Sequence, residues 1–284
     1  MNILLLGATG YLGGNIAHRL SEDGHELFCA IRNTSDTSRI EDIPSISFIS
    51  SNKSEIEITM KHSGIDWVIN SVCTYKRNDT LYGDMLSSNI LYPLEVLNLA
   101  VKYQVKNFIT IGTSLPENLN LYSFTKNKYS EFGKFLCKMD DINFADLKLE
   151  IFYGGLFEPE DRFISSCIKK LRNNEPLSLT RGIQKRDLVR VEDVVAIISE
   201  IVASDYLKNY MSLSIGSGEN HSIVEIMEFL KSEIGSESEL KFGDIISREG
   251  EPDTLADVSW YKDIGYTLQY GFFDGLREEC KTKC

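Results

Sequence analysis

Metal-binding side chains and disulfide patterns are scarce in this chain of 284 residues. It has only four histidines, and its six cysteines are scattered, with no C-x-x-C pair among them. Zinc sites need closely spaced Cys and His ligands, and disulfide frameworks need regularly spaced cysteines. The sequence therefore predicts no metal site and no disulfides, as expected for a protein of the reducing cytoplasm.

Positive charge and long apolar runs are also in short supply. Lys and Arg number 30 against 42 Asp and Glu, which gives a formal net charge of −12 at pH 7. Such an acidic chain is poorly suited to bind nucleic acid or an anionic membrane surface. No apolar run approaches the roughly 18 residues of a membrane helix. The apolar start MNILLLGATG lacks a basic segment and breaks at Gly7, so we expect a buried strand there rather than a signal peptide.

What the chain does contain is an alternation of short apolar runs and amphipathic stretches. Near-continuous apolar runs are typical of parallel strands that are covered on both faces. We predict strands at NILLL, ELFCAI, ISFI, DWVIN and NFITI, and helices over 12–20, 56–62, 88–103 and 122–139. This alternation predicts an α/β fold of the Rossmann type, with a doubly wound parallel sheet.

The second half of the sequence has a less regular rhythm. It holds a helix-start signature, the capping box Ser222-x-x-Glu225, but no repeat and no flexible linker. We expect a dinucleotide-binding domain with the catalytic residues over 1–153. A smaller lobe over 154–284 is expected to bind the substrate and to be interleaved with the last strands of the sheet.

A glycine-rich loop follows the first predicted strand and opens the first predicted helix. Gly7, Gly10 and Gly13 suit a tight turn, a close approach to a pyrophosphate, and close packing of helix on strand. The helix N-terminus would then face the phosphates. We assign a dinucleotide to this loop, with the remaining contacts from Thr9, Tyr11, Leu12 and, at the end of the fourth strand, Asn70.

The end of the second strand indicates which dinucleotide binds. NAD sites usually place an acid there to hold the ribose 2′-hydroxyl. In this chain the expected position, near Ile31, is apolar and Arg32 follows it. Arg32 could pair with a 2′-phosphate, helped by Ser35 or Arg39, so the sequence favours NADP(H) over NAD(H).

Tyr122 and Lys126 form the second candidate constellation. Their spacing places both side chains on one face of a predicted helix. The Lys126 ammonium would lower the pKa of Tyr122 from about 10, and a nicotinamide cation would act in the same direction. Thr113, at the end of the fifth strand, is placed to hydrogen-bond the oxygen that Tyr122 protonates, with Ser114 as the alternative.

These motifs together resemble an extended short-chain dehydrogenase/reductase of the NAD(P)-dependent sugar epimerase/dehydratase family. The resemblance covers nearly the whole chain and is carried by GATGYLGG, Thr113, YSFTK, Asn89 in SSNILYPLEVLNLA, RDLVRVEDVV at 186–195 and SIGSGENHSI at 214–223. Within the family, GTSLPENLNLYSFTK and LKLEIFYGG are most similar to the reductases that form CDP-paratose and CDP-abequose.

The resemblance implies a 4-keto deoxysugar substrate linked to a nucleotide diphosphate. It also implies that Lys126 holds the nicotinamide ribose and that Asn89 supports the site. A homodimer built from the helices near 88–103 and 122–139 would be expected as well. A diphosphate needs cationic partners. We expect Arg186 to be one, resemblance adds Arg248, and Lys170, Lys185 and Arg190 are possible neighbours.

Two departures from the family pattern narrow the reaction. Ser114-Leu115 follows Thr113 where a sugar 4,6-dehydratase usually carries Asp-Glu, which argues against dehydration. The acid that many epimerases keep on the second strand is missing as well. Both absences favour a simple reductase.

The sequence thus predicts NADPH-dependent reduction of the C4 keto group of a nucleotide-linked 4-keto-6-deoxy or 3,6-dideoxy hexose. Such a reaction would serve the synthesis of surface polysaccharide such as O-antigen. CDP, dTDP and GDP all remain open as the carrier. The alternatives are a sugar-nucleotide 4-epimerase with tightly bound cofactor and a non-catalytic dinucleotide sensor or scaffold. The set of Thr113, Tyr122 and Lys126 argues against the sensor.

Overall fold

The computed structural model describes residues 1–75, 80–246 and 250–282. It divides the chain into two compact units that exchange segments along the sequence. The first consists of Met1–Leu149 and Val195–Leu213, and the second of Glu150–Val194 and Ser214–Cys284. The first change of unit, after Leu149, lies close to the boundary expected at residue 153. Residues 195–213 belong to the first unit, although they lie in the part of the sequence assigned to the substrate lobe.

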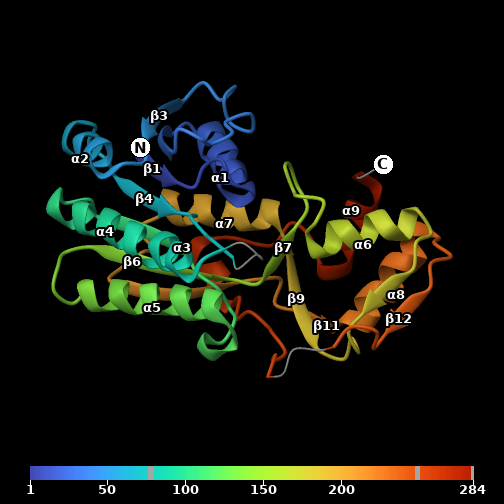
Figure 1. Cartoon of the computed structure of the whole chain (residues 1–284). Helices are drawn as coiled ribbons and strands as arrows, with labels where there is room; N and C mark the ends of the chain where they lie inside the picture. Colours follow the sequence, from blue (N-terminus) through green and yellow to red (C-terminus); the bar gives the residue numbers. More distant parts are fainter. Residues whose placement is uncertain (76–79, 247–249, 283–284) are drawn as a thin grey trace. The chain divides into compact units, whose positions relative to one another are not determined.

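A parallel sheet forms the centre of the first unit (Figure 1). Its strands are β1 (Asn2–Leu6), β2 (Glu26–Ile31), β3 (Ile46–Ser50), β4 (Trp67–Asn70), β5 (Asn107–Ile111), β6 (Asn143–Leu149) and β10 (Tyr210–Ile215). Within the described residues this seven-stranded sheet has the order β10-β6-β5-β4-β1-β2-β3. The pairs from β3 to β6 are all parallel. The strand order reverses between β1 and β4, where doubly wound sheets bind their ligands, so the predicted α/β fold is confirmed.

Helices cover both faces of this sheet. They are α1 (Tyr11–Glu22), α2 (Lys53–His62), α3 (Tyr82–Leu86), the π-helix η1 (Ser87–Leu91), α4 (Tyr92–Lys102), the 3-10 helix η2 (Glu117–Leu119), α5 (Leu121–Leu136) and α7 (Val191–Ala203). Buried residues of α2, α4 and α5 pack with Phe108 of β5 and Phe144 of β6 in one apolar cluster. On the other face lie α1 and α7 (Figure 1).

The stretch FADLKLEIF contains the point at which the chain passes from one sheet to another. It forms two strands, β6 and β7 (Ile151–Tyr153), which belong to different sheets. The chain changes sheets at Glu150, whose N–H donates to the carbonyl of Ile215. Polar residues such as Asp146 and Lys148 already occur within β6, so Glu150 alone does not reveal the change of sheet.

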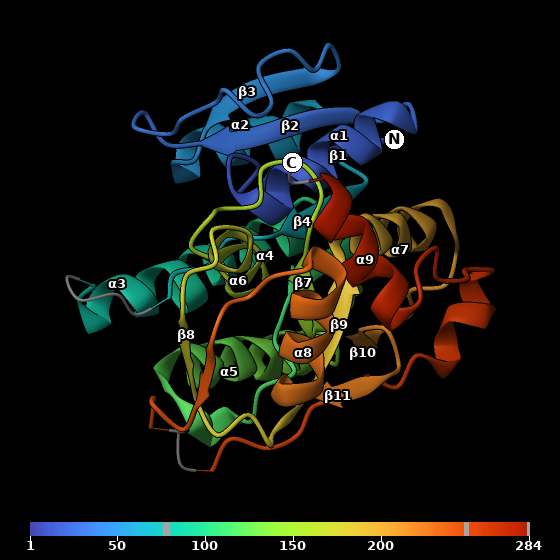
Figure 2. The same ribbon diagram turned by 90° about the vertical axis from the view of Figure 1, so that its right-hand side faces the viewer.

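The second unit is built from small sheets and packed helices. Strands β7, β9 (Lys185–Arg190) and β11 (Asn220–Ser222) form one sheet, and β8 (Leu177–Leu179) pairs with β12 (Leu240–Phe242). The helices are α6 (Phe163–Arg172), α8 (Ile223–Ile234), the 3-10 helix η3 (Ser259–Ile264) and α9 (Phe272–Thr282). α8 packs against α6 and α9 and contacts β11, as Figure 2 shows for α8 and β11. The predicted capping box is confirmed: Glu225 N–H donates to Ser222 Oγ over 3.2 Å, and Ser222 N–H donates to Glu225 Oε2 over 2.7 Å.

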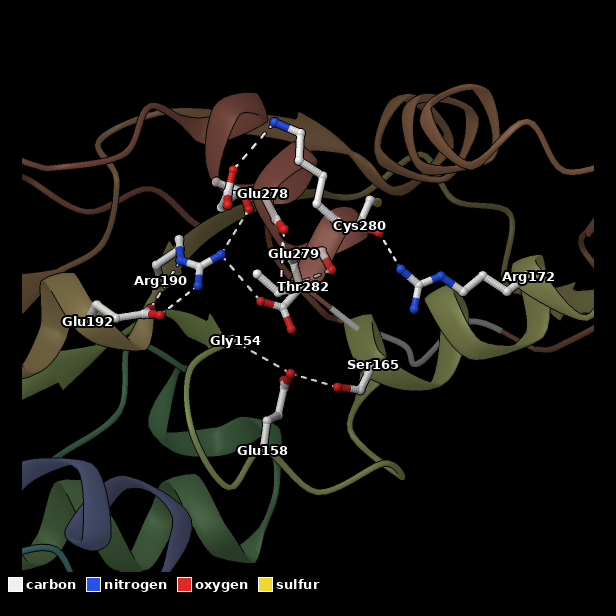
Figure 3. A network of polar contacts seen from close by, with 12 residues as sticks. Gly154, Glu158, Ser165, Arg172, Arg190, Glu192, Glu278, Glu279, Cys280 and Thr282 are labelled. Carbon is white, nitrogen blue, oxygen red and sulfur yellow. Dashed lines mark hydrogen bonds and ion pairs between the residues drawn. The ribbon is translucent and has the colours of Figure 1, made fainter. Parts of the chain in front are cut away.

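A buried arginine ties α9 to β9 within the second unit (Figure 3). Arg190 Nη2 lies 2.6 Å from Glu192 Oε1, and Arg190 Nη1 lies 3.2 Å from Glu279 Oε2. Nearby, the Glu158 carboxylate accepts from the Gly154 N–H over 3.1 Å and from Ser165 Oγ over 2.6 Å. Arg190 is therefore paired with two carboxylates, and a diphosphate at this position would have to compete with both.

No helix in the part of the chain that the structure describes combines the length and the apolar character needed to span a bilayer.

Candidate active site

The glycine loop is closed so tightly that a side chain has no room at its third glycine. Gly7 adopts a left-handed backbone with φ of 81°. The Gly10 N–H donates to the carbonyl oxygen of Gly7 over 3.0 Å. A Cβ added to Gly13 would lie 2.0 Å from that same oxygen. The loop therefore needs glycine at 7 and 13 for the turn and for close helix packing.

The N-terminus of α1 is suited to an anion. Gly10 caps the helix, so no side chain satisfies the first N–H groups. The N–H groups at a helix N-terminus, together with the helix dipole, attract phosphate. Arg39 brings a cation to the loop, since its Nη1 donates to the carbonyl of Thr9 over 3.1 Å. Tyr11 and Leu12 are buried in the first turn. This loop fits the pyrophosphate of a dinucleotide, with backbone groups of Gly7–Gly13 to hold it.

Arg32 is exposed just beyond β2, and its backbone N–H donates to Ser35 Oγ over 3.1 Å. The predicted helper Ser35 thus shapes the turn after β2. Arg39, the other predicted helper, contacts the glycine loop instead.

Two asparagines fasten the loop that follows β4. Asn70 Nδ2 donates to Thr110 Oγ1 over 3.1 Å, and Asn70 Oδ1 accepts from the Val72 N–H over 3.2 Å. Asn89, in the π-helix η1, hydrogen-bonds both backbone groups of Thr74. Its Oδ1 accepts from the Thr74 N–H over 2.8 Å, and its Nδ2 donates to the Thr74 carbonyl over 3.0 Å. Its Nδ2 also donates to Thr125 Oγ1 over 3.1 Å. Both side chains are buried and hold the protein's own groups, so their geometry supports a role in shaping the site.

Lys126 lies beneath this same loop. Its side chain is only 4% exposed, and its Nζ donates to the carbonyl of Val72 over 3.1 Å. Burial lowers the pKa of Lys126, while the charges of Cys73 and Asp146 act in the opposite direction.

Tyr122 and Thr113 meet at the ends of α5 and β5. Their side chains share a hydrogen bond that favours the phenolate, but burial dominates and raises the pKa of Tyr122 well above its usual value. The prediction that Lys126 lowers this pKa is therefore wrong for the chain by itself. Lys126 donates to the Val72 carbonyl. The loss of hydration on burial of the Tyr122 phenol outweighs every other effect on its pKa. At neutral pH Tyr122 is a protonated phenol, which is the form that can donate a proton.

Two further residues of this region, Tyr75 and Asp146, were not predicted from the sequence. Tyr75 packs on Tyr122 with ring centroids 4.4 Å apart. Asp146 is 2% exposed on β6, and its Oδ2 accepts from Ser130 Oγ over 2.7 Å. A polar residue in a buried strand could have drawn attention to Asp146. Tyr75 lies in an irregular segment, and only the convergence of parallel strand ends could have pointed to it.

Ser114 follows Thr113, and its backbone N–H donates to the carbonyl of Leu149 over 3.2 Å. Arg186 belongs to the second unit and is only 4% exposed. Its Nη1 donates to the carbonyls of Lys185 and Pro252, and its Nη2 lies 2.8 Å from Glu251 Oε1. A diphosphate at Arg186 would thus compete with the Glu251 carboxylate. Arg248 lies outside the described residues.

Within residues 1–75, 80–246 and 250–282, no group of three or more His, Cys, Asp or Glu side chains could hold a metal ion.

Comparison with known proteins places this geometry in a family. The curated "CDP-abequose synthase" of Salmonella muenchen is 25% identical over 290 residues, covering 99% of this chain and 97% of that protein. The structure of UDP-glucuronic acid 4-epimerase from Bacillus cereus, in complex with UDP-glucuronic acid and NAD, superposes with a TM-score of 0.83 at 23% identity, covering 99% of this chain and 98% of that one. UDP-glucose 4-epimerase of Thermotoga maritima, with UDP-glucose, also gives 0.83, at 18% identity and the same coverage. The model of the NAD dependent epimerase/dehydratase family matches residues 3–216, and the chain belongs to this family.

Proposed function

We propose that the protein reduces the C4 keto group of a nucleotide-linked 4-keto-6-deoxy or 3,6-dideoxy hexose, with NADPH as the reductant. The observation that carries this proposal is the meeting of Thr113 with a protonated Tyr122, beside a buried Lys126 and with no carboxylate directly after the threonine. A dehydratase or an epimerase must first remove a proton from the sugar. A reductase needs a proton donor, and a phenol with a raised pKa is one.

The chain's own residues divide the work of this reaction. The glycine loop would hold NADPH, which would supply the hydride for the C4 carbon. Tyr122 donates its proton to the carbonyl oxygen as negative charge develops there, and then regains a proton from water. Thr113 donates a hydrogen bond to the same oxygen and stabilises that charge. Lys126 would hold the nicotinamide ribose with the ammonium that now reaches the Val72 carbonyl.

The curated relative supports a sugar nucleotide as substrate, since its name is "CDP-abequose synthase". CDP-sugars are therefore the first substrates to test, followed by the dTDP and GDP forms. Each 4-keto-6-deoxy sugar would be made in the assay by its own dehydratase. Loss of the near-ultraviolet absorbance of NADPH with one of them would establish the reaction and identify the nucleotide.

A pair of variants on α5 tests the assigned proton donor. Tyr122→Phe should lower kcat by about 10²- to 10⁴-fold, the usual contribution of a positioned acid, while NADPH still binds. Tyr129→Phe is the matched control, because Tyr129 is buried on the same helix and its hydroxyl donates to the Pro93 carbonyl. Full activity of Tyr122→Phe would refute the mechanism.

Arg32 is the residue proposed to select NADPH. No acid stands at Ile31 or Arg32 to hold a ribose 2′-hydroxyl. Arg32→Ala should therefore raise the Kd for NADPH and leave that for NADH nearly unchanged, which isothermal titration would measure. An equal rise in the Kd values for NADPH and NADH would contradict recognition of the 2′-phosphate by Arg32.

A 4-epimerase is the second candidate, because the solved structures that the fold resembles include 4-epimerases in complex with NAD. Such an enzyme would retain tightly bound oxidised cofactor through purification and would return the hydride to the opposite face. Purified protein that carries NAD⁺ and interconverts C4 epimers without net NADPH loss would favour this reading.

We also propose that the protein is a homodimer. Exposed apolar side chains gather on the expected helices, namely Leu91 of η1 and Phe124, Phe132 and Phe135 of α5. Light scattering should give the mass of two chains, and Phe132→Asp should shift it toward one. Phe48→Asp, at an exposed phenylalanine of β3, is the control. A monomeric wild type would refute the dimer.

A further inference from the structure

A second tyrosine covers the proposed proton donor. The ring centroids of Tyr75 and Tyr122 lie 4.4 Å apart, with the ring planes inclined by 32°. The side chain of Tyr75 is 50% exposed, whereas Tyr122 is partly buried behind it. Aromatic rings in such close contact attract each other beyond their burial. Tyr75 therefore covers part of the Tyr122 ring, and its own ring is half exposed.

The segment that carries Tyr75 is fastened to α5 at two points. Lys126 Nζ donates to the carbonyl of Val72 over 3.1 Å. Asn89 holds both backbone groups of Thr74 and also donates to Thr125 Oγ1 of α5 over 3.1 Å. Both contacts lie just before Tyr75 in the sequence and tie its segment to the helix that carries Tyr122. The pair of rings is thus supported by polar contacts on that side of Tyr75.

The ionisable groups around Tyr122 come from two elements. Tyr75 and Cys73 lie on the segment after β4, and Lys126 lies one turn along α5. After burial, the charges of Tyr75 and Cys73 raise the pKa of Tyr122, and so does a hydrogen bond from Tyr122 to Tyr75, while the Thr113 hydroxyl lowers it. Tyr75 and Thr113 therefore act on the Tyr122 hydroxyl in opposite directions.

We propose that Tyr75 is a positioning residue, whose ring fixes the ring of Tyr122 and whose hydroxyl holds the Tyr122 hydroxyl in a hydrogen bond until a substrate oxygen replaces it. The catalytic consequence rests on the proposed reductase function, whereas the effect on the state of Tyr122 does not. Substrate entry would exchange one oxygen partner of Tyr122 for another. Removing the Tyr75 hydroxyl and removing its ring should therefore have different effects.

Nuclear magnetic resonance of the full chain, labelled with ¹³C at tyrosine Cζ, tests the first part without any substrate. Among the thirteen tyrosines, Tyr122→Phe identifies the resonance of Tyr122. In Tyr75→Phe this resonance should move at neutral pH and should titrate about one unit lower, the usual effect of one lost hydrogen bond. Tyr82→Phe, at an exposed tyrosine of α3, is the control and should leave it in place.

Turnover tests the second part. Tyr75→Phe should keep kcat within about threefold of wild type. The alkaline limb of the pH profile of kcat should move to lower pH by the same amount as the titration of Tyr122. Tyr75→Leu should lower kcat by about tenfold or more with little change in KM, because a misplaced acid costs rate rather than binding. A Tyr122 resonance that is unchanged in both Tyr75 variants would overturn the inference. Absence of turnover in wild type, with the resonance shifted in Tyr75→Phe, would instead count against the proposed reaction alone.

Discussion

Gly13 marks a point at which one added methyl group would collide with the main chain. Its Cβ would lie 2.0 Å from the carbonyl oxygen of Gly7, and backbone atoms of a tight turn have little freedom to move aside. Gly13→Ala should therefore cost about 3 kcal/mol or more, the upper end for overpacking. Urea unfolding followed by circular dichroism would measure the loss.

Gly83→Ala is the matched control for this substitution. Gly83 lies in α3, and nothing is within 4 Å of the Cβ that it would gain. Alanine there should stabilise the protein by about 0.5–1 kcal/mol, because glycine is the poorer helix former. Equal effects of the two alanines would show that the glycine loop is looser than described.

Asp146 should make stability depend on pH. Burial raises its pKa, and the hydrogen bond from Ser130 and the charges of Lys148 and Lys126 offset this only in part. An Asp with a raised folded pKa contributes stability below its unfolded pKa of about 3.9, and this stability is lost as the pH rises through the folded pKa. The free energy of unfolding of Asp146→Asn, relative to wild type, should thus rise between about pH 4 and pH 7. Urea unfolding at several pH values across that range would measure this. If the pKa of Asp146 is not raised, the difference in unfolding free energy between variant and wild type would stay constant with pH.

At the scale of the element, α5 depends on its first turn for both stability and chemistry. Asn120 Oδ1 accepts from the Ser123 N–H over 2.9 Å, and Tyr122 lies inside this cap. Asn120→Ala should cost about 1 kcal/mol of unfolding free energy and should also lower kcat, because the frayed turn carries Tyr122. Thermal unfolding and steady-state rates would be measured side by side.

The N-terminus of α2 offers the control for this experiment. Asn52 Oδ1 accepts from the Glu55 N–H over 2.9 Å in the same manner, but α2 carries no residue of the candidate site. Asn52→Ala should lose similar stability and keep kcat. If both variants lost activity in proportion to stability, the cap of α5 would have no special part in catalysis.

Most elements of the first unit were predictable because each has a local cause. β1 coincides with NILLL, since a strand covered on both faces is apolar throughout. α5 ends at Leu136, before the predicted Met139, and its start was indicated by the family motif. The break between β6 and β7 and the helix α9 were missed, because the first depends on distant pairing partners and the second lies in a largely polar tail.

The candidate site was predictable only where spacing and chemistry coincide. Tyr122 and Lys126 could be found from their helical spacing, and Thr113 from its place after a strand. Tyr75 contacts Tyr122 because the segments after β4 and β5 converge in space, which no spacing in the sequence encodes. The direction of the pKa shift of Tyr122 also required the structure, because burial depends on the whole surrounding fold.

At the scale of the whole molecule, the net charge of −12 should make stability sensitive to salt. Repulsion among like charges weakens as the Debye length falls from about 30 Å at 0.01 M to about 8 Å at 0.15 M salt. Salt also weakens the exposed ion pairs, but each of these contributes little. The Tm should therefore rise when NaCl is added over this range, as differential scanning calorimetry would show. A falling Tm would mean that ion pairs dominate.

The return of 195–213 to the first unit has a consequence for synthesis on the ribosome. β10 is the edge neighbour of β6, and it is translated after roughly 60 intervening residues, which takes about 3–12 s at usual elongation rates. Throughout that interval the nascent sheet has an unpaired edge at β6. Such an edge is a template for pairing with other chains. The pace of translation between these two strands thus becomes a determinant of how much of the newly made protein reaches its native state.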